Sequence, residues 1–247
     1  MPEDNQQEIK QDDIPKPDGK VVSKQLHFFW IADCSESMSG KKIATLNQAI
    51  KEAIPAIQEA LENYPQVEVM MRAIRFSDDA EWHVGPEPVP LSEFSWEDIE
   101  CGGLTATARA IDLLISALDI EEMPRRGLPP VCILISDGYC TDPTNEYNAA
   151  IENIDSVPWG VKSVRLSIAI GNESEYNEKE LLRFVNQENV GLLKAHSPEE
   201  LLSYIKWASV SASVASSTGR GSSAEGNPSN VNLTNPPVVV TSSTDLF

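Results

Sequence analysis

The chain is poor in basic residues, and this shortage limits the partners that it can take. Of its 247 residues, 19 are Lys or Arg and 38 are Asp or Glu, so the formal net charge is −19. A surface of this charge repels the phosphate backbone of nucleic acids and the anionic headgroups of membranes. We therefore expect partners other than nucleic acid and lipid bilayers.

Long apolar runs and cysteines are also scarce. No run approaches the roughly 20 apolar residues that a membrane span needs, so we expect no membrane segment. Residues 1–8 contain neither the basic start nor the apolar core of a secretory signal, which predicts a cytoplasmic location. Four cysteines are too few for a disulfide framework in a chain of this size, and this agrees with a reducing compartment.

Common catalytic and phosphate-binding motifs are missing as well. The Ser-Gly-Lys-Lys at 39–42 fails as a phosphate loop, because Ser35 replaces the first Gly and Lys42 the final Ser or Thr. An EF-hand is excluded by Met38 in place of Gly and Ala44 in place of Glu. The chain has no Gly-x-Ser-x-Gly elbow and too few grouped carboxylates for two-metal hydrolysis. These absences predict a protein that is not an enzyme.

What the chain does have is an apolar run, residues 27–32, that ends abruptly in Asp-x-Ser-x-Ser. The run is too short for a helix and indicates a buried central strand. Asp33, Ser35 and Ser37 follow at the strand's carboxyl end, where open α/β sheets bind ligands. Their spacing lets one loop aim three oxygen-bearing side chains inward, which suits a hard divalent cation.

Strand-like runs and helix-like periodicities alternate along the rest of the chain. Expected strands cover 67–76, 131–135, 162–170 and 190–195, with an antiparallel edge strand at 80–84. Expected helices cover 41–63, a segment from 105 to about 118, 145–154, 178–186 and 198–209, and residues 85–101 are expected to form a loop. This order predicts an α/β fold, a doubly wound, mainly parallel sheet with helices on both faces and one antiparallel edge strand.

Composition sets the expected domain limits. Residues 1–22 are polar and without periodicity, which predicts a flexible arm. The folded domain is expected to cover 23–209. Residues 210–247 are rich in Ser and lack helical periodicity, which predicts a disordered tail.

Two later segments complete a family pattern. Residues 101–105, Cys-Gly-Gly-Leu-Thr, place Thr105 in a Gly-rich loop before a helix. Residues 131–138 form an apolar run that ends in Ser-Asp-Gly and places Asp137 after a buried strand. Together with the Asp33 loop, these pieces resemble the metal-ion-dependent adhesion site of von Willebrand factor A (vWA) domains, over roughly residues 25–209. The resemblance implies a metal site made of Asp33, Ser35, Ser37, Thr105 and Asp137.

Each of these residues also has an ordinary structural explanation. Ser35 or Ser37 could cap the helix after the loop, and Thr105 could cap the next helix. The Asp137-Gly138 pair is by itself an ordinary turn. Thr107 competes with Thr105 as the metal ligand, although the position after the Gly-rich turn matches the family better.

Three cysteines lie beside the proposed metal loops. Cys34 is within the first loop, Cys101 precedes the second, and Cys140 follows Asp137 by three residues. A redox switch or a soft-metal site would use such thiols. Small buried residues that fill tight turns are the more common explanation.

The resemblance also implies a function. In the family, an Asp or Glu of a partner completes the coordination of the metal, so we expect a protein partner that presents a carboxylate. Mg²⁺ is the expected ion, and Mn²⁺ should substitute for it. The Asp-x-Ser-x-Ser-Met-x-Gly form resembles TerY-like proteins of bacterial tellurite-resistance and stress-response systems, which implies phosphorylation signalling with a kinase or phosphatase partner. The alternative is a vWA subunit of an ATP-driven remodelling or metal-insertion complex.

Overall fold

The computed structural model describes residues 23–119, 121–124, 127–217, 233–239 and 246–247. The predicted arm at 1–22 lies outside these residues. The strands are β1 (Lys24–Asp33), β2 (Val67–Phe76), β3 (Ala80–Pro90), β4 (Val131–Ser136), β5 (Val164–Ile170) and β6 (Leu193–Ala195). The helices are η1 (Glu36–Met38), α1 (Lys41–Leu61), α2 (Thr107–Ala117), α3 (Thr144–Ile154), α4 (Pro158–Lys162), α5 (Glu178–Phe184) and α6 (Pro198–Ser217).

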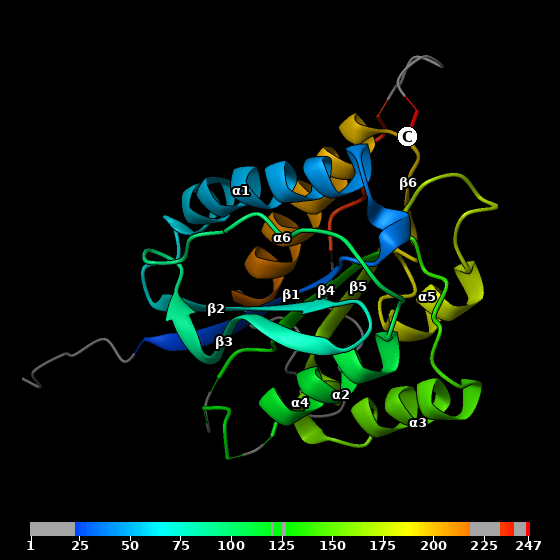
Figure 1. The fold of residues 1–247 in the computed structure, drawn as a ribbon. Helices are drawn as coiled ribbons and strands as arrows, with labels where there is room; N and C mark the ends of the chain where they lie inside the picture. The colour runs from blue at the N-terminus through cyan, green and yellow to red at the C-terminus, as the bar shows by residue number, and fades with distance from the viewer. Residues whose placement is uncertain (1–22, 120, 125–126, 218–232, 240–245) are drawn as a thin grey trace, which may run out of the picture.

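In the described part of the chain the strands form one sheet in the order β3-β2-β1-β4-β5-β6. Strand β3 runs antiparallel to β2, and every other neighbouring pair is parallel. Helices cover both faces of this sheet (Figure 1). The predicted fold class, a doubly wound and mainly parallel α/β sheet with one antiparallel edge strand, is confirmed.

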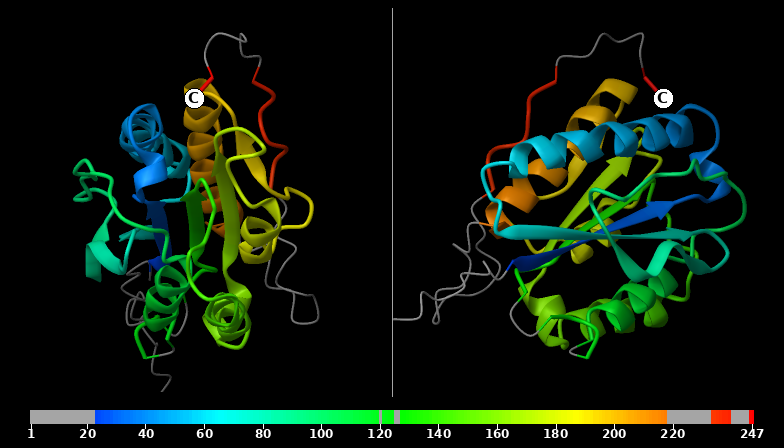
Figure 2. Two further views of the ribbon diagram at one scale, coloured as in Figure 1. Left: turned by 45° about the vertical axis from the view of Figure 1, so that its right-hand side comes forward. Right: turned by 90° about the vertical axis from the view of Figure 1, so that its left-hand side faces the viewer.

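Strand β1 lies at the centre of the sheet, and its side chains alternate between two cores. Phe28 and Trp30 belong to the core under α1 and α6, whereas Phe29 and Ile31 belong to the core under α2 and α3. The two helix layers lie on opposite sides of the sheet in both views of Figure 2. Because both faces of β1 are buried from Leu26 onward, residues 28–32 form a continuous apolar run rather than an alternating pattern.

The path of the chain fixes where the site lies. Strand β1 pairs with β2 on one side and with β4, which comes later in the chain, on the other. The order therefore reverses beside β1, which is the place where open α/β sheets form a crevice at the carboxyl ends of their strands.

The edge of the sheet differs from the prediction. Strand β3 continues to Pro90, so the prediction of a strand at 80–84 followed by a loop was wrong in extent. The prolines at 86, 88 and 90 argue against an inner strand, but an edge strand tolerates them because its outer N–H groups need no partner in the sheet. The pairing of β3 with β2 contains register shifts.

The segment after β3 has no regular structure, as predicted, but it is not a surface loop. Phe94, Trp96 and Ile99 are buried in the core under α1. Asn47 of α1 holds the segment, because its Oδ1 accepts from Trp96 Nε1 at 2.9 Å and from the Ile99 N–H at 3.1 Å. The segment therefore reaches residues 101–105 in a fixed position.

The end of the domain was also predicted wrongly. Helix α6 continues to Ser217 instead of ending near Ser209, so residues 210–217 of the predicted disordered tail are helical. Residues 233–239 are described as well, with Leu233 buried and Trp207 Nε1 donating to Thr234 Oγ1 at 3.0 Å. Residues 218–232 and 240–245 lie outside the described part, so the rest of the tail prediction stays a prediction.

The remaining differences are small. Helix α4 was not predicted, and α1, which contains Pro55, ends at Leu61 rather than at residue 63. The predicted start of α6 is confirmed, because Ser197 Oγ accepts from the Glu200 N–H at 3.2 Å and Pro198 is the first helical residue. Within the described residues, no helix combines the length and the apolar character needed to span a bilayer.

Candidate metal centre

Four of the five predicted site residues meet at the carboxyl ends of β1 and β4. Asp33 is the last residue of β1, and Ser35 and Ser37 follow in the turn that contains η1. Asp137 directly follows β4, the parallel neighbour of β1. The register of the two strands therefore places loops from distant parts of the chain side by side.

A continuous chain of hydrogen bonds connects these side chains. Ser35 Oγ and Ser37 Oγ lie 3.0 Å apart, and Ser37 Oγ donates to Asp137 Oδ1 at 2.8 Å. The Ser35 N–H donates to Asp33 Oδ1 at 2.8 Å and fixes this carboxylate. Asp33, Ser35 and Asp137 are at most 2% exposed, whereas Ser37 is exposed. The group therefore opens to solvent beside Ser37.

Backbone hydrogen bonds join residues 101–105 to the Asp33 loop. The Glu36 N–H donates to the Gly103 carbonyl at 3.1 Å, and the Gly102 N–H donates to the Cys34 carbonyl at 2.9 Å. Gly103 has a φ of +81°, a left-handed value that favours glycine. The two loops therefore pack backbone against backbone.

Thr105 also pairs with the loop after β4. Its N–H donates to Thr141 Oγ1 at 3.0 Å, and its carbonyl accepts from the Thr141 N–H at 2.9 Å. Thr105 is 5% exposed. All three predicted loops therefore form one assembly, in which the Thr105 loop contacts both of the others through its backbone.

The capping explanations for these hydroxyls do not hold. Ser35 occupies the N-cap position of η1 without a side-chain cap bond, and Gly40 rather than a serine precedes α1. Helix α2 begins after Ala106, so Thr105 is not its cap. Thr107, the alternative ligand, is the first residue of α2. The turn explanation for Asp137 is compatible with the structure, because Gly138 has a φ of +76°.

Two residues at the site were missed from the sequence. Ser136 Oγ donates to Asp33 Oδ2 at 2.5 Å and accepts from the Gly138 N–H at 2.8 Å. Lys42 Nζ lies 3.1 Å from Asp137 Oδ2 and 3.7 Å from Glu175 Oε2. The only sequence feature that points to Ser136 is its position at the end of an apolar run. The sequence feature that points to Lys42 is its position, as a basic residue, at the start of the helix that follows the Asp33 loop.

Burial makes the Asp33 carboxylate receptive to a cation. Burial raises the pKa of Asp33 to about 6, an effect that hydrogen bonds from Ser136 and Ser35 oppose and the charge of Asp137 reinforces. A raised pKa means that the charged form lacks the stabilisation that water would give. A positive ion placed beside Asp33 and Asp137 would supply it.

The donor set fits a hard divalent ion. It consists of two carboxylates and three hydroxyls, all of which are oxygen donors of the kind that Mg²⁺ and Mn²⁺ prefer. Within the described ranges there is no cluster of three or more His, Cys, Asp or Glu side chains that could hold a metal. Any ion at this edge therefore depends on the hydroxyls of Ser35, Ser37 and Thr105.

Burial disfavours the thiolate form of the neighbouring cysteines. Cys34 is buried and donates from Sγ to the Phe76 carbonyl at 3.3 Å. Burial raises the pKa of Cys34, and it raises that of Cys101 to about 12 and that of Cys140 to about 11. Reactive or metal-binding cysteines need the thiolate. These values favour the packing explanation for the three residues.

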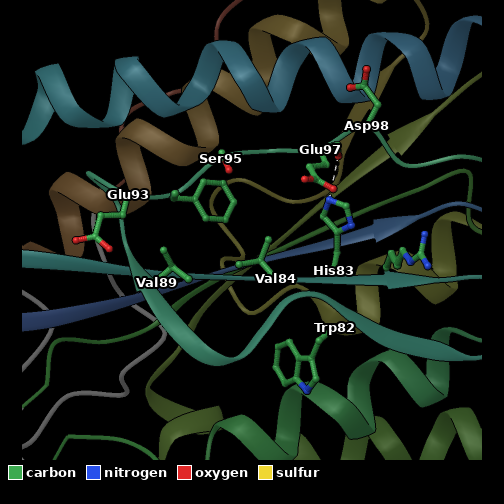
Figure 3. A pocket seen from close by; sticks show the side chains of 10 residues that line it. Trp82, His83, Val84, Val89, Glu93, Ser95, Glu97 and Asp98 are labelled. Atoms are coloured by element: carbon green, nitrogen blue, oxygen red, sulfur yellow. Dashed lines mark hydrogen bonds between the residues drawn. The ribbon is translucent and has the colours of Figure 1, made fainter.

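A cavity of about 490 Å³ lies elsewhere, between β3 and the segment that follows it. Figure 3 shows His83 and Val84 of β3 facing this segment, with the His83 ring bonded to the Glu97 carbonyl at 2.9 Å. None of the five predicted site residues lines this cavity. A smaller pocket of about 270 Å³, lined in part by Cys34, Asp78 and Gly102, opens beside the metal loops.

Comparison with known proteins supports the fold. No protein-family model and no curated protein matches the sequence. The solved structures that are similar to it include a von Willebrand factor type A protein from Catenulispora acidiphila, proximal thread matrix protein 1 from the mussel byssus with zinc in its MIDAS motif, and the pilus adhesin SpaC from Lactobacillus rhamnosus GG. Their TM-scores are 0.58, 0.52 and 0.58, at 15%, 16% and 13% identity.

The similarity covers 77%, 78% and 75% of this chain but 43%, 46% and 30% of the respective solved chains. This chain thus spans less than half of the length of each. At these identities the match is one of fold. The chain has the fold of von Willebrand factor A domains.

Proposed function

We propose that this chain is a metal-dependent protein-binding module. A divalent cation would be held by Asp33, Ser35, Ser37, Thr105 and Asp137, and an Asp or Glu of a partner protein would complete its coordination. The observation that carries the proposal is the 2.8 Å hydrogen bond between Ser37 and Asp137, which joins side chains 100 residues apart in the sequence. This bond brings oxygen donors from separate loops together at the carboxyl edge of the sheet, where one cation would bind them jointly.

The chemistry of the donors supports Mg²⁺ as the ion, with Mn²⁺ as a substitute. Two carboxylates balance the charge of a divalent ion. The remaining ligands are neutral hydroxyls, which donate weakly, so the ion can still bind one more anionic ligand. Zinc in the MIDAS motif of the mussel protein supports a divalent ion in a site of this kind. The name of the SpaC adhesin supports a role in binding rather than catalysis.

The biological setting is a further part of the proposal. The Asp-x-Ser-x-Ser-Met-x-Gly motif of residues 33–40 supports a TerY-like protein of a cytoplasmic bacterial stress-response or phosphorylation-signalling system, with a kinase or phosphatase as the partner. Such a module would hold a partner without catalysing a reaction. The alternative role, a vWA subunit of an ATP-driven remodelling or metal-insertion complex, uses the same site but a motor protein as the partner.

A pull-down from native lysate tests this function. The full chain would be used with Mg²⁺, with chelator, and as the Asp33→Ala variant, and bound proteins would be identified by mass spectrometry. Asp98→Ala is the matched control, because Asp98 is an exposed carboxylate that pairs with Lys51 at 2.6 Å away from the site.

We expect a partner that is lost with chelator and with Asp33→Ala but retained with Asp98→Ala. A kinase or phosphatase among the lost proteins would support the signalling role, whereas an ATPase motor would support the alternative. Retention of every partner in all lanes would contradict metal-dependent binding.

A further inference from the structure

Exposed large apolar side chains are few in the described part of the chain, and two of them border the metal loops. Leu104 is 60% exposed and immediately precedes Thr105, and Tyr139 is 53% exposed and follows Asp137 by two residues. Of the others, Val161 and Leu182 lie on α4 and α5, and Val238 and Leu246 lie in the last described segments. Isolated exposed apolar residues need no explanation, but a pair beside a candidate site does.

The two side chains are mounted on loops that are fixed and paired with each other. The Leu104 N–H donates to Asp78 Oδ1 at 2.8 Å, and Tyr139 Oη donates to the Ser174 carbonyl at 3.0 Å. Between them, Thr105 and Thr141 exchange the two hydrogen bonds that join the loops. Because these loops are already fixed, a partner that covers Leu104 and Tyr139 does not have to order them, which suits an interface.

The surroundings restrict the charge of that partner. The pocket of about 270 Å³ beside the Asp33 loop is lined by the carboxylates of Asp78, Asp79, Glu81 and Glu100 and by one basic residue, Arg75. Arg75 already pairs with Glu81 at 2.7 Å. A partner with several adjacent acidic residues would meet repulsion here, while a single carboxylate could reach the metal.

We infer that Leu104 and Tyr139 form the specificity rim of the site, and that the occupant is a protein segment in which one Asp or Glu is flanked by apolar side chains. This inference rests on the proposed function, because the carboxylate is expected to bind the metal. The metal alone would bind any accessible carboxylate. The rim would select those carboxylates that have apolar neighbours. A polyacidic segment is disfavoured by the same surface.

Three fluorescent synthetic peptides test the inference. Each carries one central Asp, flanked on both sides by Leu in the first, by Ser in the second and by further Asp in the third. Their affinity for the full chain would be measured by fluorescence anisotropy with Mn²⁺ and with chelator. The binding of Mn²⁺ alone to each protein would be measured separately from the signal of free Mn²⁺ in electron paramagnetic resonance.

We expect the Leu-flanked peptide to bind in the presence of Mn²⁺ about tenfold more tightly than the other two, a difference of about 1.4 kcal/mol. In the double variant Leu104→Ser, Tyr139→Ser this preference should disappear while the affinity for Mn²⁺ itself is unchanged. The matched control is Val161→Ser, Leu182→Ser, which removes exposed apolar side chains from α4 and α5. This control should keep the preference.

The outcomes distinguish a failure of the metal site from a failure of the rim. If Mn²⁺ does not bind the wild-type chain, the proposed function fails and the rim fails with it. If Mn²⁺ binds but the Leu-flanked peptide shows no Mn²⁺-dependent advantage, or keeps its advantage in the rim variant, the inference about Leu104 and Tyr139 is overturned and the metal site stands.

Discussion

Lys42 Nζ lies 3.1 Å from Asp137 Oδ2, and the Asp137 side chain is only 3% exposed. The ammonium group thus supplies a positive charge at the carboxylate that the proposed cation also needs. A bound divalent ion and Lys42 would compete for Asp137, since both are attracted to the same oxygens. Glu175, 3.7 Å from Nζ, gives Lys42 a second carboxylate partner.

The variant Lys42→Met should therefore change stability and metal affinity in opposite directions. Without metal, the buried Asp137 carboxylate loses its ionic partner, and we expect the free energy of unfolding to fall by about 1 to 3 kcal/mol. With the repulsive ammonium removed, the affinity for Mg²⁺ should rise. Urea unfolding and calorimetric titration measure the two effects.

Lys51→Met is the control for this pair of effects, because Lys51 and Asp98 form an exposed ion pair. Exposed pairs contribute about 0 to 1 kcal/mol, so both quantities should stay close to those of the wild type. A decrease in Mg²⁺ affinity in Lys42→Met would show that Lys42 supports the site rather than competing with the ion.

Gly103→Ala should disturb the site through the backbone. A methyl group on Gly103 would lie 2.7 Å from the Asp78 carboxylate, at a residue whose φ is +81°. We expect a loss of about 1 to 3 kcal/mol in the free energy of unfolding and weaker Mn²⁺ binding, because the Thr105 loop must shift.

The neighbouring Gly102→Ala gives the comparison, since a methyl group there meets no atom within 4 Å. It should unfold within about 0.5 kcal/mol of the wild type and bind Mn²⁺ normally. Equal behaviour of the two variants would contradict the role of the 101–105 turn in shaping the site.

Thr105 rather than Thr107 should supply the metal ligand. Both threonines are buried, but Thr107 belongs to helix α2 while Thr105 lies in the loop joined to the other two. Thr105→Val keeps the shape and removes the hydroxyl, and should weaken Mn²⁺ binding about tenfold or more. Thr105→Ser should restore most of it. If Thr107→Val causes the loss and Thr105→Val does not, the assignment of the ligand is wrong.

His27 should make the stability of the fold depend on pH. Its Nδ1 lies 2.9 Å from Arg72 Nη1, so the ring accepts a bond from a cation and must be neutral. Burial, with the charge of Arg72, lowers the pKa of His27 from 6.5 to about 4. Since the folded state disfavours the proton, the contribution of this group is complete above pH 6.5 and is lost as the pH falls toward 4.

The size of that loss is on the order of 3 kcal/mol for a pKa shift of this extent. Denaturant unfolding of the wild type and His27→Gln at several pH values measures it, because other titrating groups affect both proteins equally. The wild type should lose stability relative to the variant by about this amount between pH 6.5 and 4. Parallel stability curves would show that His27 is not held neutral in the folded state.

Much of the fold followed from patterns that burial imposes on the sequence. The apolar runs of β1, β2 and β4 are buried on both faces, so their sequences clearly predict inner strands. The Asp33 and Asp137 loops were found because polar residues interrupt such runs at the strand ends. These features depend on local sequence and on the general geometry of parallel sheets.

The errors arose where tertiary packing overrides local preference. In the part of α6 beyond Ser209, Ala212 and Ser213 are fully buried, because α6 packs against α1 and small side chains fit there. Such a stretch carries no strong hydrophobic pattern, so its sequence alone predicts a tail rather than a helix. The pairing of Lys42 with Asp137 and of Ser136 with Asp33 depends on contacts 95 and 103 residues apart, which no local pattern encodes.

The most direct test of the metal site is a calorimetric titration of the full chain with Mg²⁺, repeated for Ser37→Ala and Ser39→Ala. Both serines are exposed and lie in the same turn, but Ser37 Oγ bonds to Asp137 whereas Ser39 Oγ bonds to the Glu36 carbonyl at 2.6 Å. We predict one Mg²⁺ per chain for the wild type and for Ser39→Ala, and binding weakened about tenfold or more for Ser37→Ala. Absence of Mg²⁺ binding by the wild type, or equal affinities in all three proteins, would contradict the site.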